Sequence, residues 1–308
     1  MRAVDISVRR WTGAAPPTGE AIAALRKHPR FPEAFAAGIS HLVEMYRGNR
    51  AISQVLNDRG RVAFGLLVLY LHYSRDAGGL TASRLKTVCS ETGLCSPGRA
   101  TALLSLMRFA GYIASAPHPL DRRIRVLVPT ERLISDHRER LRGEIAALAL
   151  LLPEGQIGLT HIEDPQFIAE MACCFGEAFR SGFRLLDCAP ELFQLADRNA
   201  GLVILMSLLL ARESGDTIPP QRPVAISISE LSRRFGVSRP HVLKLLRDAN
   251  AEGFIQIAAA EPQRVLVLPA LGETLQNFFA AVQLIIAYCI RTSLDGMGQA
   301  DRRMAISA

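Results

Sequence analysis

Basic and hydroxyl side chains recur at helical spacing in the segment that begins with Ser96 and Pro97. Serine caps helices well and proline suits the first helical position, so a helix is expected here. One face of this helix is apolar, with Ala100, Leu103, Leu104 and Met107. The other face carries groups that could contact phosphate oxygens or base edges: Ser96, Arg99, Thr101, Ser105 and Arg108.

A shorter helix just upstream is expected to hold this one in place. In residues 81–89, three apolar side chains fall on one face of the expected helix, and Thr81 or Ser83 can cap its N-terminus. Gly93 follows and can adopt the positive φ of a tight turn. The pattern predicts a helix-turn-helix, whose second helix enters the DNA major groove with its N-terminal end.

A β-hairpin is predicted directly after the second helix. Residues 111–113 read as the start of one strand and residues 124–129 as the return strand, with a polar loop between them. Arginines at a hairpin tip beside a recognition helix suit contact with phosphates or with the minor groove. The candidates are Arg122, Arg123 and Arg125.

The segment from Leu80 to Leu133 resembles the MarR family of winged-helix regulators. Asp121 and Arg123 match the D-x-R motif of the family's wing. Residues 128–130 replace the family's Leu-Thr pair, and the glycine that usually follows is missing. The resemblance implies a homodimer made by the terminal helices and a small-molecule effector or oxidant that relieves repression.

Landmarks of the first half recur in the same order about 140 residues further along the chain. A period of that length is a whole domain, so a duplicated module is predicted. The pairs are Pro29-Arg30-Phe31 with Pro165-Gln166-Phe167, Asp58-Arg59 with Asp197-Arg198, the apolar runs 65–73 and 201–211, Gly111-Tyr112-Ile113 with Gly253-Phe254-Ile255, and 126–129 with 266–269.

The second half predicts a helix-turn-helix of its own. Gly236 makes the turn and Ser238 caps the second helix, whose apolar stripe is Val242, Leu245, Leu246 and Ala249. Its hairpin is two residues shorter, and the arginine cluster of the first tip is reduced to Arg264. The residues predicted to face DNA are Arg239, His241, Lys244 and Arg247.

The predicted fold is mainly α with small β-hairpin wings: two winged helix-turn-helix domains with flanking N- and C-terminal helices that form a pseudo-dimer. The predicted parts are a flexible tail (1–18), a first copy (19–152), a second copy (153–292) and a flexible C-terminal tail (293–308). Two arrangements remain open. Either both copies read an asymmetric or imperfectly palindromic site, or only the first copy engages DNA and the second is a scaffold or dimerisation half.

Charge supports an anionic partner for the first half. Residues 1–152 carry 22 Lys and Arg against 12 Asp and Glu, whereas the second half carries 14 against 17. No signal peptide is visible, and the apolar runs Leu202–Ala211 and Phe278–Ile290 are too short or interrupted to span a bilayer. We therefore expect a cytoplasmic, nucleoid-associated protein that does not enter membranes.

Other functional classes have weaker support in the sequence. No P-loop, nucleophile elbow, Rossmann glycine set or zinc-ligand spacing is present, so no enzyme activity, cofactor or metal is expected. The six cysteines read as buried thiols, and a redox role for Cys173 and Cys174 stays open. The main rival to a sequence-specific DNA-binding regulator is a tandem winged-helix scaffold that binds proteins in a chromosome-associated or regulatory complex.

Overall fold

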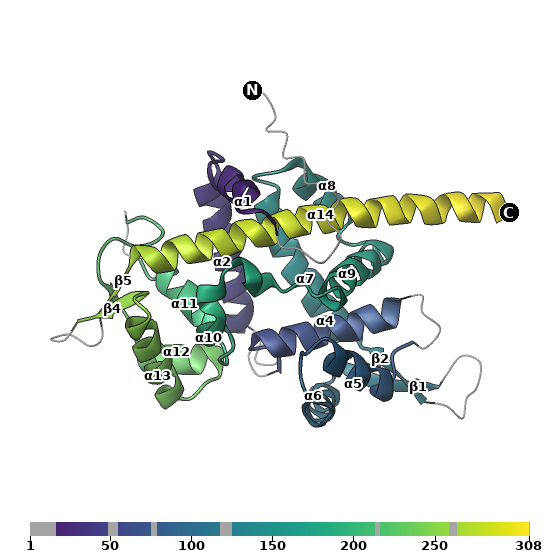
Figure 1. The fold of residues 1–308 in the computed structure, drawn as a ribbon, viewed down its shortest axis with the longest axis horizontal. Helices are drawn as coiled ribbons and strands as arrows, with labels where there is room; N and C mark the ends of the chain where they lie inside the picture. Colours follow the sequence, from purple (N-terminus) through teal and green to yellow (C-terminus); the bar gives the residue numbers. More distant parts are fainter. Residues whose placement is uncertain are drawn as a thin grey trace.

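The chain is mostly helical, with short strands in a two-stranded and a three-stranded antiparallel sheet (Figure 1). This confirms the predicted class, mainly α with small β-hairpins. The computed structural model describes residues 17–48, 55–74, 79–117, 125–212, 216–258 and 264–307. The predicted N-terminal tail lies outside the described residues up to residue 16, and Thr18 caps the first helix with its hydroxyl.

The order of elements recurs along the chain. The first half contains α1 (Gly19–Arg26), α2 (Phe31–Gly48), α4 (Arg59–Tyr73), α5 (Ala82–Glu91), α6 (Pro97–Phe109), β1 (Ile113–Pro117), β2 (Arg125–Pro129) and α7 (Glu131–Leu148). The second half contains α8 (Pro153–His161), α9 (Pro165–Arg180), the short helices η1 (Leu185–Cys188), η2 (Pro190–Leu192) and α10 (Phe193–Ala196), then α11 (Gly201–Leu210), β3 (Val224–Ala225), α12 (Ile228–Phe235), α13 (Arg239–Ala251), β4 (Ile255–Ile257), β5 (Arg264–Val267) and α14 (Pro269–Ser307).

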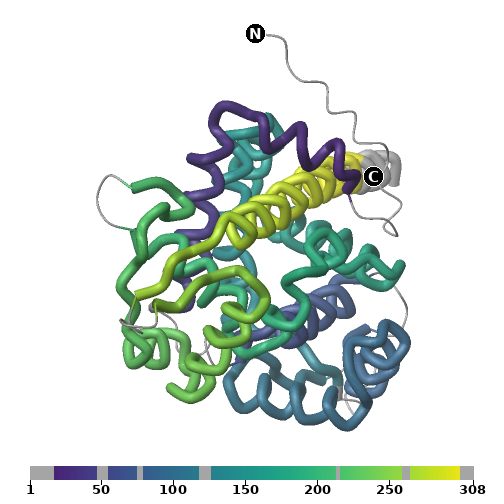
Figure 2. The backbone as a smooth tube through the Cα atoms, turned by 60° about the vertical axis from the view of Figure 1, so that its left-hand side comes forward, coloured from purple at the N-terminus to yellow at the C-terminus, as the bar shows by residue number. Residues whose placement is uncertain are grey.

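Helices of each half pack against helices of the other half. α4 of the first half packs on α9 of the second half, and α11 of the second half packs on α2 of the first half in the same way. Likewise α1 packs on α14, as Figure 2 shows, and α8 packs on α7. The main hydrophobic core therefore runs through both halves, from Ile22 in α1 to Leu284 in α14.

The Asp-Arg pair of the predicted repeat has a different role in each half. Asp58 caps α4 by accepting a hydrogen bond from the Arg61 amide at 2.8 Å. The repeat would make Asp197 the counterpart of Asp58 at the start of the second apolar helix, but this expectation is wrong, because α11 begins at Gly201 and Asp197 closes α10. Asp197 instead forms an ion pair with Arg59 at 2.6 Å, which joins the two halves.

The junction between α4 and α9 is tightly packed. A Cβ atom at Gly176 of α9 would lie 2.2 Å from the Tyr70 ring of α4, so only glycine fits there. The Tyr70 hydroxyl accepts a hydrogen bond from Nη1 of Arg180 at 2.9 Å. This close approach fixes how the two halves sit against each other.

α14 is the longest helix and crosses the molecule. Over Pro269–Gly298 it is long and apolar enough to span a membrane, but 67% of its most apolar window is buried inside the protein, as in the core helix of a soluble protein. The sequence predicts a flexible tail from residue 293, whereas α14 continues as a helix to Ser307.

A polar contact is buried between α7 and α14. Gln283 is fully buried and donates its Nε2 hydrogen to a carboxylate oxygen of Glu144 at 2.8 Å. Burial raises the pKa of Glu144 to about 7, against the pull of Arg140. Burial also lowers the pKa of His137, on the same helix, to about 4. These titratable groups belong to the scaffold and lie apart from the predicted DNA-contacting helices.

Candidate nucleic-acid interface

α5 is the helix that supports α6. Its N-cap is Thr81, whose hydroxyl accepts a hydrogen bond from the Arg84 amide at 3.2 Å, as predicted. Its buried face consists of Leu85, Val88 and Cys89. These side chains anchor α5 to the core and so fix the angle between α5 and α6.

The turn and the start of α6 follow the sequence prediction closely. Gly93 has a φ of +66°, which side chains with a Cβ rarely adopt. Ser96 then caps α6 through the Arg99 amide at 3.3 Å, and Pro97 occupies the first turn. The predicted stripe is buried: Ala100, Leu103, Leu104 and Met107.

The outer face of α6 is polar and has no carboxylate. Arg99, Thr101, Ser105 and Arg108 are all exposed. The Thr101 hydroxyl donates to the Pro97 carbonyl oxygen at 2.9 Å, and the Ser105 hydroxyl donates to the Thr101 carbonyl oxygen at 3.0 Å. Both hydroxyl oxygens keep lone pairs that can accept from a ligand, while the guanidinium of Arg99 extends from the first turn of the helix.

The hairpin after α6 consists of β1 and β2, which pair from Ile113 with Pro129 to Pro117 with Arg125. Arg108 of α6 donates to the Ser115 hydroxyl of β1 at 3.3 Å and links the helix to the hairpin. Arg122 and Arg123 lie outside the described residues. Arg125 lies in β2, and its side chain is outside the described part of the chain.

The second half builds the same unit from α12, α13, β4 and β5. Ser227 caps α12, and Gly236 ends it with a φ of +65°. Ser238 caps α13 through the His241 amide at 3.3 Å. Its predicted stripe is also buried: Val242, Leu245, Leu246 and Ala249.

Part of the outer face of α13 is engaged in contacts within the chain. Nε2 of His241 lies 2.9 Å from the carbonyl oxygen of Asn199, which it can reach as a donor. Asp248 pairs with Lys244 at 3.4 Å and also with Arg198. The segment that supplies Asn199 and Arg198 follows the short helix α10. Arg239 and Arg247, the other predicted residues, are exposed.

Two large apolar side chains are exposed on these helices. Phe109 ends α6 with 93% of its surface exposed, and Leu243 of α13 is 41% exposed. Neither was expected to contact a partner, and both lie on the helices predicted to read DNA.

A hollow of about 500 Å³ on the outside of α5 adds residues that the sequence analysis missed. Hydroxyl and ammonium groups suit phosphate contacts. The signal was present, because Ser83, Lys86, Thr87 and Ser90 follow helical spacing opposite the apolar stripe. The hollow is lined by Ser83, Lys86, Thr87, Ser90, Glu91 and Pro97.

The two units lie on the same side of the molecule. Figure 1 shows α6 and α13 at its lower edge, opposite α1 and α8, and Figure 2 shows the same arrangement from another direction. A long polymer such as duplex DNA could therefore meet both helices along one side of the protein.

Three of the six cysteines are buried, Cys89, Cys174 and Cys289, whereas Cys95, Cys173 and Cys188 are only partly buried. Cys89 lies on the buried face of α5. Burial raises the pKa of its thiol to about 12, which disfavours the reactive thiolate. The sulfur atoms of Cys174 and Cys289 lie 3.1 Å apart in the buried contact between α9 and α14. Within the described ranges, no three His, Cys, Asp or Glu side chains are placed to hold a metal ion.

No family model matches the chain, and no curated protein or solved structure matches it either. The functional argument therefore depends on the geometry of the two units.

Proposed function

We propose that this protein is a sequence-specific regulator of transcription that binds double-stranded DNA. In this proposal the units α5–β2 and α12–β5 are winged helix-turn-helix modules, and one chain holds both in a pseudo-dimer. Each half supplies helices to the other, so a single chain supplies the surfaces that two subunits of a symmetric regulator would supply. The protein acts on DNA without catalysing a reaction.

The outer face of α6 carries the proposal. It presents Arg99, Thr101 and Ser105 on the N-terminal and middle turns, with no acidic side chain among them. Short polar side chains let a helix approach the base edges, and an arginine there can bind guanine through two hydrogen bonds. The hydroxyls and Lys86 of α5 would contact the phosphates beside the groove.

The two halves have unequal roles in this proposal. α6 supplies the main contact with bases, and the arginines Arg122, Arg123 and Arg125 add contacts with phosphates or the minor groove. α13 contributes through Arg239 and Arg247, because His241 and Lys244 already have partners within the chain. If both helices enter the major groove together, they must be about 34 Å apart, which is one turn of DNA.

Selection of bound sequences from a random pool of duplexes tests the proposal. We expect one strongly preferred half-site for α6 and a weaker one about one helical turn away. Affinity should fall steeply with rising salt, because phosphate contacts release counterions. Failure to bind duplex DNA at low salt would contradict the proposal.

A protein-binding scaffold is the second candidate. The observation that favours it is the exposure of Phe109 and Leu243 on the two helices. Substituting both residues with serine separates the functions. Loss of duplex binding would mean that these side chains support the DNA surface, whereas unchanged duplex binding leaves them available for a protein partner.

A further inference from the structure

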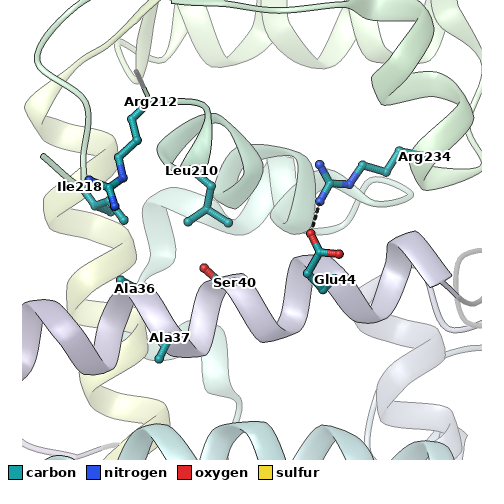
Figure 3. Close-up of a pocket in the computed structure, with 8 residues that line it drawn as sticks. All are labelled: Ala36, Ala37, Ser40, Glu44, Leu210, Arg212, Ile218 and Arg234. Atoms are coloured by element: carbon teal, nitrogen blue, oxygen red, sulfur yellow. Dashed lines mark hydrogen bonds and ion pairs between the residues drawn. The ribbon is translucent and has the colours of Figure 1, made fainter. Parts of the chain in front are cut away.

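A hollow of about 470 Å³ lies between α2 and the second helix-turn-helix unit. Its floor is α2 with the small residues Ala36, Ala37 and Ser40, and its walls come from the end of α11, the following linker and α12 (Figure 3). Arg212 and Arg234 stand toward its two ends, with Leu210 between them, as Figure 3 shows. We propose that this hollow binds an aliphatic dicarboxylate.

The two guanidinium groups are the reason for an anionic ligand. Arg212 is exposed, and its Nη1 donates to the carbonyl oxygen of Asp216 at 2.5 Å. Arg234 donates Nη2 to the Glu44 carboxylate at 3.1 Å. Among the described residues of the lining, Glu44 is the one carboxylate beside two arginines, so these residues together carry more positive than negative charge.

Arg234 also has an unused donor. Its Nε is buried and has no hydrogen-bond partner among the described residues. A buried donor without an acceptor costs free energy, and a ligand oxygen that Nε reaches when the Arg234 side chain turns into the hollow would remove that cost. A guanidinium presents its donors as a planar fork, which matches a carboxylate.

The spacing sets the length of the ligand. Eight residues of α2 separate Ala36 from Glu44, a distance of about 12 Å along the helix axis. Arg212 and Arg234 stand toward the two ends of this span (Figure 3), so we propose an extended diacid of about six carbons, a length that leaves room for a guanidinium group at each end. Its methylene groups would lie against Leu210 and Ile218, which are apolar.

The corresponding junction in the other half is closed, which shows that the hollow does not follow from the fold alone. There α4 packs on α9, and the Tyr70 ring lies against Gly176. Arg180 uses its guanidinium to bind the Tyr70 hydroxyl. Where α11 packs on α2, the described lining of the hollow contains no aromatic ring, and the arginines remain beside open space.

Isothermal titration calorimetry with adipate tests the site without involving DNA. Hexanoate, with one carboxylate, and 1,6-hexanediol, with none, are the matched probes. We expect adipate to bind, hexanoate to bind about tenfold more weakly or worse, and the diol to give no heat of binding. Absence of adipate binding, or equal affinity for adipate and hexanoate, would exclude a two-ended dicarboxylate site.

Substitutions locate the site. Arg212→Gln and Arg234→Gln should each weaken adipate binding about tenfold or more. Arg222→Gln and Arg233→Gln are the matched controls, because both residues are exposed nearby and neither lines the hollow. Circular dichroism checks folding, and Arg212→Gln is informative even if Arg234→Gln unfolds. Unchanged adipate affinity in Arg212→Gln would overturn the assignment.

A consequence for DNA binding rests on the proposed function. The pair of Glu44 and Arg234 ties α2 to α12, so a carboxylate that draws Arg234 away from Glu44 loosens the second unit. Saturating adipate should then weaken duplex binding about fivefold or more. Adipate binding with unchanged duplex affinity would refute this coupling and leave the site, whereas adipate binding by a protein that never binds duplexes would refute the proposed function alone.

Discussion

The two halves share a buried architecture and differ on their outer faces. In both, a serine caps the second helix of the unit, a glycine with positive φ precedes it, and four apolar residues bury its inner side. In the first half the outer residues of α6 face solvent. In the second half His241 and Asp248 bind the segment that follows α10.

The junctions between the halves differ in the same manner. Tyr70 fills the space where α4 meets α9, whereas a hollow remains where α11 meets α2. Packing requirements keep the inner positions alike, because each must fill the same kind of space between helices. The outer positions are free of that constraint, so the halves can take on different tasks.

The largest expected effect is a loss of stability at the junction between α4 and α9. Gly176→Ala forces a methyl group into the Tyr70 ring and should lower the free energy of unfolding by about 3 kcal/mol, the upper end for overpacking. Ser40→Ala, at the corresponding place on α2, should change it by about 0.5 kcal/mol or less. Urea unfolding of both variants measures the difference, and equal effects would show that the junctions are equivalent.

The second effect compares α6 and α13, the two helices proposed to contact DNA bases. Arg99→Ala should weaken binding to the selected duplex by about 1–3 kcal/mol and relax the preference at one base position. His241→Ala should change binding by less, because that side chain is already bound to Asn199. Fluorescence anisotropy with the selected site and its single-base variants measures both. A larger loss for His241→Ala would reverse the proposed division of roles.

The third effect concerns the arginines of the first hairpin. Arg122→Ala combined with Arg123→Ala should weaken binding to every duplex by about tenfold. Two lost phosphate contacts should also make the slope of log affinity against log salt shallower by about 1.8. Arg264→Ala, in the second hairpin, is the control, since Arg264 donates to the Pro223 carbonyl oxygen at 2.8 Å. An unchanged salt slope in the double variant would remove the hairpin from the DNA surface.

The smallest effect is a pH dependence of stability. Glu144 has a pKa of about 7 in the folded protein and 4.5 without burial, so the folded state favours its protonated form. That contribution is complete below pH 4.5 and is lost as the pH rises toward 7. Glu144→Gln should therefore gain stability relative to the unsubstituted protein as the pH rises. The gain should be only about 1 kcal/mol, because the Glu144 side chain keeps some exposure to solvent, which weakens the effect of its burial.

Thermal unfolding from acidic to mildly alkaline pH measures this difference. The lowered pKa of His137 acts in the opposite sense, because the folded state excludes its proton until the pH falls toward 4. His137 is present in both proteins and cancels in the comparison. A stability difference that does not change with pH would place the titration elsewhere.

Local patterns in the sequence predicted the elements well. Ser96 and Pro97, Gly93 and the stripe ending at Met107 each depend on neighbours within a few residues, and each lies where it was expected. The buried stripe of α13 was predicted for the same reason. Capping, turn geometry and helical spacing are properties of a short segment, so they can be read without the fold.

Contacts between distant segments could not be predicted in this way. In the sequence an arginine follows both Asp58 and Asp197. In the fold, however, Asp197 lies at the end of α10 and forms an ion pair with Arg59. Nothing near His241 in the sequence indicates that Asn199 will lie beside it. The hollow beside Arg212 and Arg234 is formed together with residues of α2. These residues lie roughly 170 to 200 positions before the two arginines in the sequence.

The reciprocal packing of helices from the two halves also has a consequence for assembly. When such contacts form between separate molecules, the assembly dissociates on dilution. Here both partners belong to one chain, so their effective concentration is set by the connection between α7 and α8. The assembled form should therefore persist at a few copies per cell, and its melting temperature should not change with protein concentration.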